Sequence, residues 1–419
     1  MFAKLKQIAS PKSKELRKRI YFTLGILFIF KVGTTIIVPG VDRANLQTST
    51  LGFLELVNIM GGGAMEQFSI FALGVMPYIT ASIIMQLAQM DIIPAVAEMA
   101  KEGHTGRQKI NKISRILGIG IAFVQGYLMS FAFIQHGTVL DYMQFSLVLT
   151  AGTALLLWMG DRITAKGVGN GISLIIMAGI IASMPSMFVQ AWNVLSDADT
   201  GTILFGAFIF IYLAIVFGIV FVETARRKIP IQYANKSTQY SGNNYIPFKL
   251  NSAGVIPVIF ASTLLSAPAF ISEFSNNERL TNFVENYLMM NSGPGFVLYI
   301  GLIMAFCYFY THLQIKPKEM AENLQKNGGY IPGIRPGNDT VEYVKSVINN
   351  LTFVGAMFLA FIAGLPIIFA NITNLPPSVS IGGTGLLIVV GVALETYRKI
   401  DSELTSRTFE GRRTRARQR

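Results

Sequence analysis

The chain has 419 residues, of which 52% are hydrophobic and only 14% are charged, and its formal net charge is +12. Soluble domains carry about 25% charged residues, and disordered chains have low hydrophobicity, so this composition excludes both classes and is typical of a polytopic membrane protein. The single cysteine, Cys307, cannot form an internal disulfide, and no Cys/His cluster offers zinc ligands.

Long stretches without charged residues predict membrane-spanning helices, each of which needs about 20 apolar residues. The first predicted span, 20–38, is interrupted by Lys31 but is otherwise apolar. The stretch 346–394 is too long for one helix and contains several prolines and asparagines, so it predicts two spans, 346–369 and 379–397. The other seven predicted spans are 67–90, 116–140, 142–160, 167–196, 200–222, 250–272 and 286–315.

Ten predicted spans place both ends of the chain on the same side of the membrane. With the N-terminus in the cytoplasm, the cytoplasmic segments carry a net charge of +18 and the external loops −7, as the positive-inside rule requires. The external linker 187–203 divides the spans into two halves of five, 20–186 and 204–398. An odd number of spans per half gives the halves opposite orientations, as in inverted-repeat membrane proteins. The basic segments 1–19 and 399–419 are expected in the cytoplasm.

Ionisable side chains are scarce within the predicted spans: Lys31 is the clearest, and Glu223 and Glu395 lie near cytoplasmic ends. We interpret Lys31 as a snorkelling or internally paired cation. The histidines do not cluster, and no G-x-x-x-x-G-K-[ST] phosphate loop occurs. We therefore expect no catalytic site, no metal site and no cofactor, so uphill transport needs an ion gradient or a partner that supplies energy.

Three other segments have distinctive composition. The glycine-rich segment 58–68 is open to two interpretations, an ordinary external loop or a re-entrant helix, because irregular backbone at membrane depth must be buried or line a cavity. The cytoplasmic loops 223–250 and 316–342 are basic. The second has glycine and proline turns around Arg335, which favours the docking of a partner over simple orientation. The C-terminal tail is expected to contact anionic lipid or RNA.

Five sequence strings together resemble the SecY family of protein-translocation channels, in the same order and over essentially the whole chain. They are SIFALGVMPYITASIIMQL (69–87), KGVGNGISLIIMAGI (166–180), AGVIPVIFAS (253–262), GGYIPGIRPG (328–337) and GGTGLLIVV (382–390). The resemblance implies an all-α polytopic membrane protein with ten transmembrane helices in two inverted, pseudo-symmetric halves around a central hourglass pore.

The resemblance also implies a function. A non-enzymatic channel in the cytoplasmic membrane of a bacterium would translocate secretory polypeptides that bear a signal sequence and insert membrane proteins laterally. The SecA ATPase or the translating ribosome would drive it, and the small membrane subunits SecE and SecG would complete the complex.

Site residues follow from the same resemblance. An apolar pore ring falls on Val75, Ile79, Ile172, Ile176, Ile259 and Ile388. A plug, a short helix that closes the external side, falls on 58–68 with Gly61, Gly62, Gly63, Ala64 and Met65. The lateral gate falls on Thr80, Gln125, Ser262 and Thr263. The resemblance implies that Arg226, Arg227 and Arg335 are the residues that dock SecA or the ribosome. The i, i+4 spacing within 75–79 and 172–176 independently places each pair on one helix face.

Two alternatives stay open. The portion NKSTQYSGNNYIPFK of loop 223–250 is polar with few charges, which fits an accessory channel of the same type with a narrower substrate range. An inverted-repeat secondary transporter would also have ten spans in two halves. That alternative requires ionisable or polar ligands at the membrane midplane, and the nearly uncharged spans disfavour it.

Overall fold

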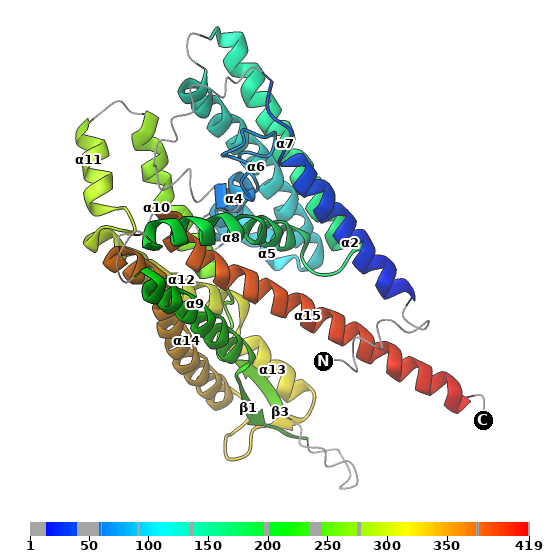
Figure 1. Ribbon diagram of the computed structural model, residues 1–419. Helices are drawn as coiled ribbons and strands as arrows, with labels where there is room; N and C mark the ends of the chain where they lie inside the picture. Colours follow the sequence, from blue (N-terminus) through cyan, green and yellow to red (C-terminus); the bar gives the residue numbers. More distant parts are fainter. Residues whose placement is uncertain are drawn as a thin grey trace.

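The computed structural model describes residues 14–39, 58–59, 61–89, 93–134, 137–196, 201–233, 245–274, 278–373, 375 and 377–417. The described chain is mostly helical (Figure 1). The helices of its first half are α2 (Lys14–Gly33), α4 (Met76–Leu87), α5 (Pro94–Lys101), α6 (His104–Phe133), α7 (Val139–Lys166) and α8 (Gly171–Ser196). Those of its second half are α9 (Gly201–Thr224), α10 (Ile256–Phe274), α11 (Glu278–Tyr287), α12 (Gly293–Gln314), α13 (Pro317–Lys326), α14 (Asn338–Thr373) and α15 (Pro377–Arg417).

Every predicted span contains or overlaps one of these helices. The short helices α5 and α13 fall in predicted loops, and α11 lies mostly in one. Within the described residues, six helical stretches are long and apolar enough to cross a membrane, and they comprise α6, α7, α8, α9, α14 and the stretch of α12 and α13. Helices α4 and α10 are apolar but shorter. The chain is therefore a mostly helical, multi-pass membrane protein.

The helices pack as two groups. In the first group, α4 packs on α6, α6 on α7, and α7 on both α2 and α8. In the second group, α10 packs on α12, α12 on α14, and α15 on both α14 and α9. The groups meet where α8 contacts α15 and α9 and where α4 contacts α10, and α8 and α15 run side by side across the middle of Figure 1.

Several helix ends differ from the expected boundaries of the spans, the linker and the tail. Helix α2 ends at Gly33, five residues before the predicted span ends, because the β-branched run that follows the glycine disfavours helix. Helix α8 ends at Ser196, as the predicted span 167–196 does, and it fills most of the expected linker 187–203. Helix α15 continues to Arg417, so residues 399–417 of the expected tail extend the last span helix instead of forming a separate segment.

The expectation of an all-α chain is wrong in detail, because the basic loops carry short strands. Strand β1 (Arg226–Pro230) pairs antiparallel with β3 (Tyr245–Lys249), and β2 (Gln232–Tyr233) pairs antiparallel with β4 (Gly329–Tyr330). Outside the membrane, water competes for backbone hydrogen bonds, so these segments have no need to be helical.

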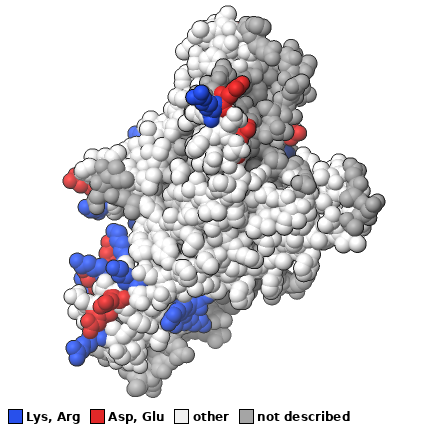
Figure 2. Space-filling model, turned by 90° about the vertical axis from the view of Figure 1, so that its left-hand side faces the viewer, with Lys and Arg blue, Asp and Glu red and all other residues white. Residues whose placement is uncertain are grey.

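Charged side chains are concentrated at the two ends of the molecule. On the face in Figure 2, most Lys and Arg side chains gather toward the lower end, a smaller charged group lies near the top, and the broad region between them is almost free of charge. An uncharged belt between two charged ends is the surface that a membrane-spanning protein presents.

Candidate functional site

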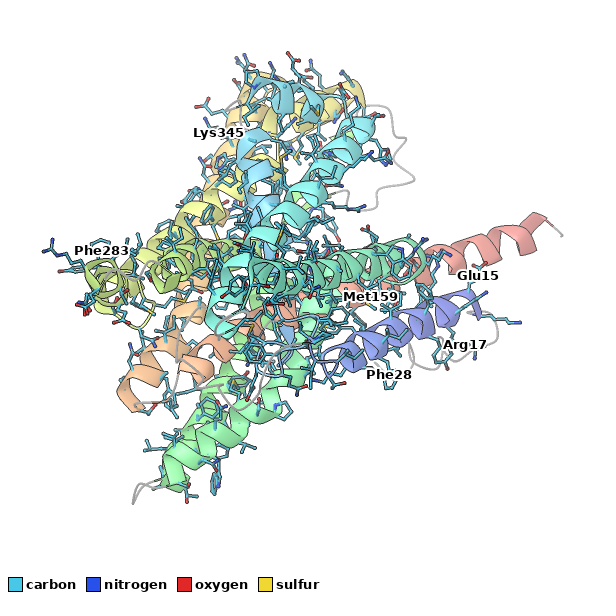
Figure 3. The ribbon with its side chains drawn as sticks, turned by 90° about the horizontal axis from the view of Figure 1, so that it is seen from above. Glu15, Arg17, Phe28, Met159, Phe283 and Lys345 are labelled. Atoms are coloured by element: carbon cyan, nitrogen blue, oxygen red, sulfur yellow. The ribbon has the colours of Figure 1, made fainter. Side chains whose placement is uncertain are left out.

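The six expected ring residues come from four helices and converge in one hydrophobic cluster at the junction of the two groups. Val75 precedes α4 directly and Ile79 lies on it, Ile172 and Ile176 lie on α8, Ile259 lies on α10 and Ile388 on α15. Four of them are between 2% and 7% exposed, and Ile172 and Ile259 are half-buried against the others. Met159 of the same cluster lies among the central helices in Figure 3.

Local sequence explains how two of these helices reach the cluster. Helix α4 begins with Pro77 in its first turn, where a missing backbone N–H costs nothing, so Val75 stands at its N-cap. Helix α8 begins at Gly171, which lies so close to α7 that an added Cβ would be 1.8 Å from the carbonyl oxygen of Gly160. Only glycine allows α8 to start against α7 in this way, and that start places Ile172 and Ile176 toward the centre.

The expected plug segment packs directly on this cluster. Ile59 and Ala64 are buried among the ring residues, while Met65 is buried in a neighbouring cluster that includes Phe270 of α10. A short helix is expected here; of the described residues of 58–68, positions 58, 59 and 61 are helical, and 62–68 form turns and a bend. Gly62 and Gly63 have φ of 74° and 81°, and this left-handed backbone interrupts a helix.

The segment is also fastened to the end of α2. The backbone N–H of Val38 donates to the carbonyl of Phe68 at 2.8 Å, and the N–H of Ile70 donates to the carbonyl of Ile36 at 2.9 Å. The Lys31 ammonium donates to the carbonyl of Gly62 at 3.1 Å. This last contact was not part of the sequence prediction, although the isolated cation in an apolar span was a visible signal for it.

The expected gate residues lie on helices α4, α6 and α10. The hydroxyls of Thr80, Ser262 and Thr263 donate to carbonyls one turn earlier in their own helices, at 3.2, 2.9 and 2.7 Å. Gln125 on α6 is half-buried. Because these hydroxyl bonds stay within one helix, α4 and α10 can separate without breaking them.

The two basic loops form one compact unit, which we call the loop module: β1, β2, β3, β4 and the first turns of α14. Its core contains Ile229, Phe248 and Ile331 packed against Val344 and Ile348 of α14. Strands β2 and β4 join the loops directly, and the Tyr330 hydroxyl donates to Gln232 Oε1 at 2.9 Å.

The expected docking arginines lie on the outside of the loop module. Arg226 and Arg227 are exposed on β1, and Arg335 is exposed in the turn before α14, where its carbonyl accepts a hydrogen bond from the Thr340 hydroxyl at 2.9 Å. Strands β1 and β3 lie at the lower end of the molecule beside α13 (Figure 1). The structure thus brings all three arginines onto one folded unit.

A polar junction holds the part of α15 that follows its apolar stretch. Arg398 forms an ion pair with Glu223 of α9 at 3.8 Å and also donates to the Glu223 carbonyl, while Asn251 Nδ2 donates to Glu223 Oε1 at 2.9 Å. Arg19 of α2 pairs with Glu403 at 3.3 Å, and Figure 3 shows the start of α2 beside α15. Helix α15 is therefore fastened to both groups.

We also searched the described residues for side chains that could bind a metal ion. Across the described ranges, no group of three or more His, Cys, Asp or Glu side chains is placed to hold a metal ion.

Comparison with known proteins gives a consistent picture. Residues 69–397 match the SecY family. "Protein translocase subunit SecY" of Staphylococcus epidermidis (strain ATCC 35984) is 46% identical over 416 residues, which cover 95% of this chain and 97% of that protein. The protein of the same name from Staphylococcus carnosus (strain TM300) is 45% identical over 417 residues, covering 96% of this chain and 97% of that protein.

Solved structures share the fold at low sequence identity. A structure described as a protein conducting channel has a TM-score of 0.66 at 22% identity, covering 94% of this chain and 93% of that one. A SecY structure, whose plug domain is described as stabilising the closed state of the translocation channel, has a TM-score of 0.67 at 22% identity with the same coverage. Sec61 in the canine ribosome-channel complex has a TM-score of 0.64 at 21% identity, again covering 94% and 93%. The family match over most of the chain and the close bacterial relatives lead to one conclusion: this chain belongs to the SecY family.

Proposed function

We propose that this chain is the channel-forming subunit of a bacterial protein translocase, which moves signal-bearing polypeptides across the cytoplasmic membrane and releases membrane proteins sideways into lipid. The observation that carries the proposal is the convergence of six apolar side chains from four helices at the junction of the two groups, with segment 58–68 packed on them. A channel subunit of this kind is not an enzyme, and the driving energy comes from a partner.

The proposed seal is apolar. Water leaves a narrow hydrophobic constriction, so Val75, Ile79, Ile172, Ile176, Ile259 and Ile388 would block ions at rest. Their side chains make no hydrogen bonds that a passing polypeptide must break. The plug segment would cover the ring on the external side, since Ile59 and Ala64 belong to the same cluster. Separation of α4 from α10 would open the gate lined by Thr80, Gln125, Ser262 and Thr263.

The proposed topology has ten spans, with α2, α4, α6, α7 and α8 in one half and α9, α10, α12, α14 and α15 in the other, in inverted orientation. Both termini would be cytoplasmic, because the segments on that side carry +18 against −7 outside. The basic cytoplasmic ends would contact anionic lipid. SecE and SecG would complete the complex, since the relatives are named as subunits of a translocase.

The loop module is the proposed docking surface for SecA and the ribosome. Exposed arginines on a folded scaffold suit both the phosphates of ribosomal RNA and acidic protein surfaces. Structures related in fold come from ribosome complexes, namely Sec61 in the canine ribosome-channel complex and the idle yeast Ssh1 complex bound to the yeast 80S ribosome.

Reconstitution tests the proposal. The chain is purified in mild detergent to ask whether two small membrane proteins accompany it, and the complex is placed in proteoliposomes with SecA, ATP and a radiolabelled secretory precursor. We expect ATP-dependent protection of the precursor from external protease, and no protection of the same precursor without its signal sequence. Intact complex that protects no precursor, or that instead accumulates small solutes along an ion gradient, contradicts the proposal and favours the transporter.

A further inference from the structure

We propose that Lys31 is a specificity-determining residue of the channel: its ammonium holds segment 58–68 closed through the carbonyl of Gly62 and thereby sets how strong a signal sequence must be to open it. We call this contact the Lys31 latch. The inference rests on the proposed plug role of segment 58–68.

The position of the amine is fixed by the element that carries it. Lys31 lies in the last turn of α2, and the Thr34 hydroxyl donates to the Lys31 carbonyl at 2.7 Å. The backbone just beyond this turn is bonded to Phe68 and Ile70, which lie at the base of the plug segment. The amine therefore reaches Gly62 from a short, anchored stretch, with Nζ 3.1 Å from the carbonyl oxygen.

The opposite side of the segment rests on α8. An added Cβ on Gly62 would lie 3.0 Å from Gly179 Cα, and the φ of Gly62 is 74°, so only glycine fits this seat without strain. The Ser183 hydroxyl on α8 lies 3.3 Å from the Ile59 carbonyl and 3.0 Å from that of Ile180 in its own helix. Two backbone carbonyls of the segment thus accept hydrogen bonds from side chains on either side of it: that of Gly62 from Lys31 of α2, and that of Ile59 from Ser183 of α8.

The charge makes the Lys31 contact different from the Ser183 contact. A hydrogen bond from an ammonium is about twice as strong as one between neutral groups, and a cation in a span needs a partner. When the segment leaves, Lys31 loses the Gly62 carbonyl, so the bond favours the closed state. Hydrogen bonds to charged groups change an equilibrium by about tenfold to a hundredfold. Because the Lys31 side chain is exposed at the surface of the chain and not buried in its interior, we expect an effect near tenfold.

Substitutions at Lys31 isolate the latch. In planar bilayers containing the purified complex, Lys31→Met should raise the resting ion leak about tenfold. The same variant should translocate a precursor with a shortened signal sequence in proteoliposomes. Lys31→Arg, which keeps a charged donor, should remain near wild type, and Lys31→Gln should be intermediate. Lys18→Met is the matched control, because it removes the same charge from an exposed position of the same helix and should leave the leak unchanged.

Gly62→Leu tests the plug itself, since it unseats the segment from α8 whether or not Lys31 holds it, whereas Lys31→Met removes only the ammonium. Leak in both Lys31→Met and Gly62→Leu, with rescue by Lys31→Arg, supports the latch. Leak in Gly62→Leu alone overturns the latch and keeps the plug. If neither Lys31→Met nor Gly62→Leu leaks, both the latch and the plug are overturned. If Lys31→Arg leaks as much as Lys31→Met, Lys31 has a packing role and the latch is overturned. Co-purification of the small subunits confirms that each variant is assembled.

Discussion

Replacing Ile229 with alanine is expected to destabilise the loop module and leave the membrane helices intact. Ile229 lies on β1, is 2% exposed, and packs with Phe248 and Ile331 against the first turns of α14. Ile315, which follows α12, and Met320 of α13 also pack against this small core.

The size of the destabilisation follows from the apolar atoms that are removed from the core. The substitution removes three carbons, and at about 0.8 kcal/mol for each buried group the transfer free energy lost is about 2.4 kcal/mol. The cavity that remains brings the loss into the range of about 2–5 kcal/mol. Two-stranded sheets are marginally stable by themselves, so this loss is a large share of the local stability of the loop module.

Hydrogen exchange measured by mass spectrometry on the purified complex tests this. Peptides covering β1, β3 and β4 should lose about fiftyfold in protection in Ile229→Ala, the equivalent of about 2.4 kcal/mol, while peptides of α7 and α12 should not change. Arg335→Glu is the matched comparison, since it should abolish SecA-driven translocation with protection unchanged. Unchanged protection in Ile229→Ala refutes the shared core, and normal translocation by Arg335→Glu refutes the docking role.

Two further predictions concern the ties between the helix groups. Arg398→Met leaves Glu223 buried without its cation, so the free energy of unfolding in detergent should fall by about 3 kcal/mol. Adding Glu223→Gln to this variant should restore part of the loss. If the losses of the two single variants instead add up in the double variant, the two residues do not interact. Cysteines at Met65 and Phe270, which share a buried cluster, should be joined by a short cross-linker and stop translocation; full transport after complete cross-linking would remove the plug role from this segment.

The helices were largely predictable because a membrane imposes a simple rule. Uninterrupted apolar stretches must be helical in lipid, and each predicted span indeed contains or overlaps a helix. Helix ends were less predictable, because the rule stops at the membrane surface. Helix α6 begins at His104, before the predicted span 116–140, and α15 runs on to Arg417, in both cases through residues that are polar but compatible with helix.

The loop module shows what sequence patterns could not supply. Gln232 and Tyr330 are paired across two strands of two residues each, although nearly a hundred positions separate them in the chain. Strands this short have no alternating pattern to detect. The sequence therefore predicts two separate loops, 223–250 and 316–342, and their common core is visible only in three dimensions.

The contacts of the ring residues and of Lys31 were also predictable only in part. Spacing alone places 75 with 79 and 172 with 176 on common faces, but it gives no sign that α10 and α15 contribute to the same cluster. Lys31 was noted as an isolated cation, yet its acceptor is a backbone carbonyl, and every residue has one. A contact of this kind leaves no mark in the sequence of its partner.

The ion conductance of the resting complex in planar bilayers tests the central claim most directly. Ile79→Ser, Ile176→Ser and Ile259→Ser, combined in one chain, should turn an ion-tight channel into one with measurable resting current, because hydroxyls wet the constriction. Three matched Ile→Ser changes on the lipid-exposed surface, at Ile203, Ile209 and Ile372, should leave the resting complex ion-tight. Resting conductance of the ring variant equal to that of the wild type would contradict the assignment of these helices to a pore.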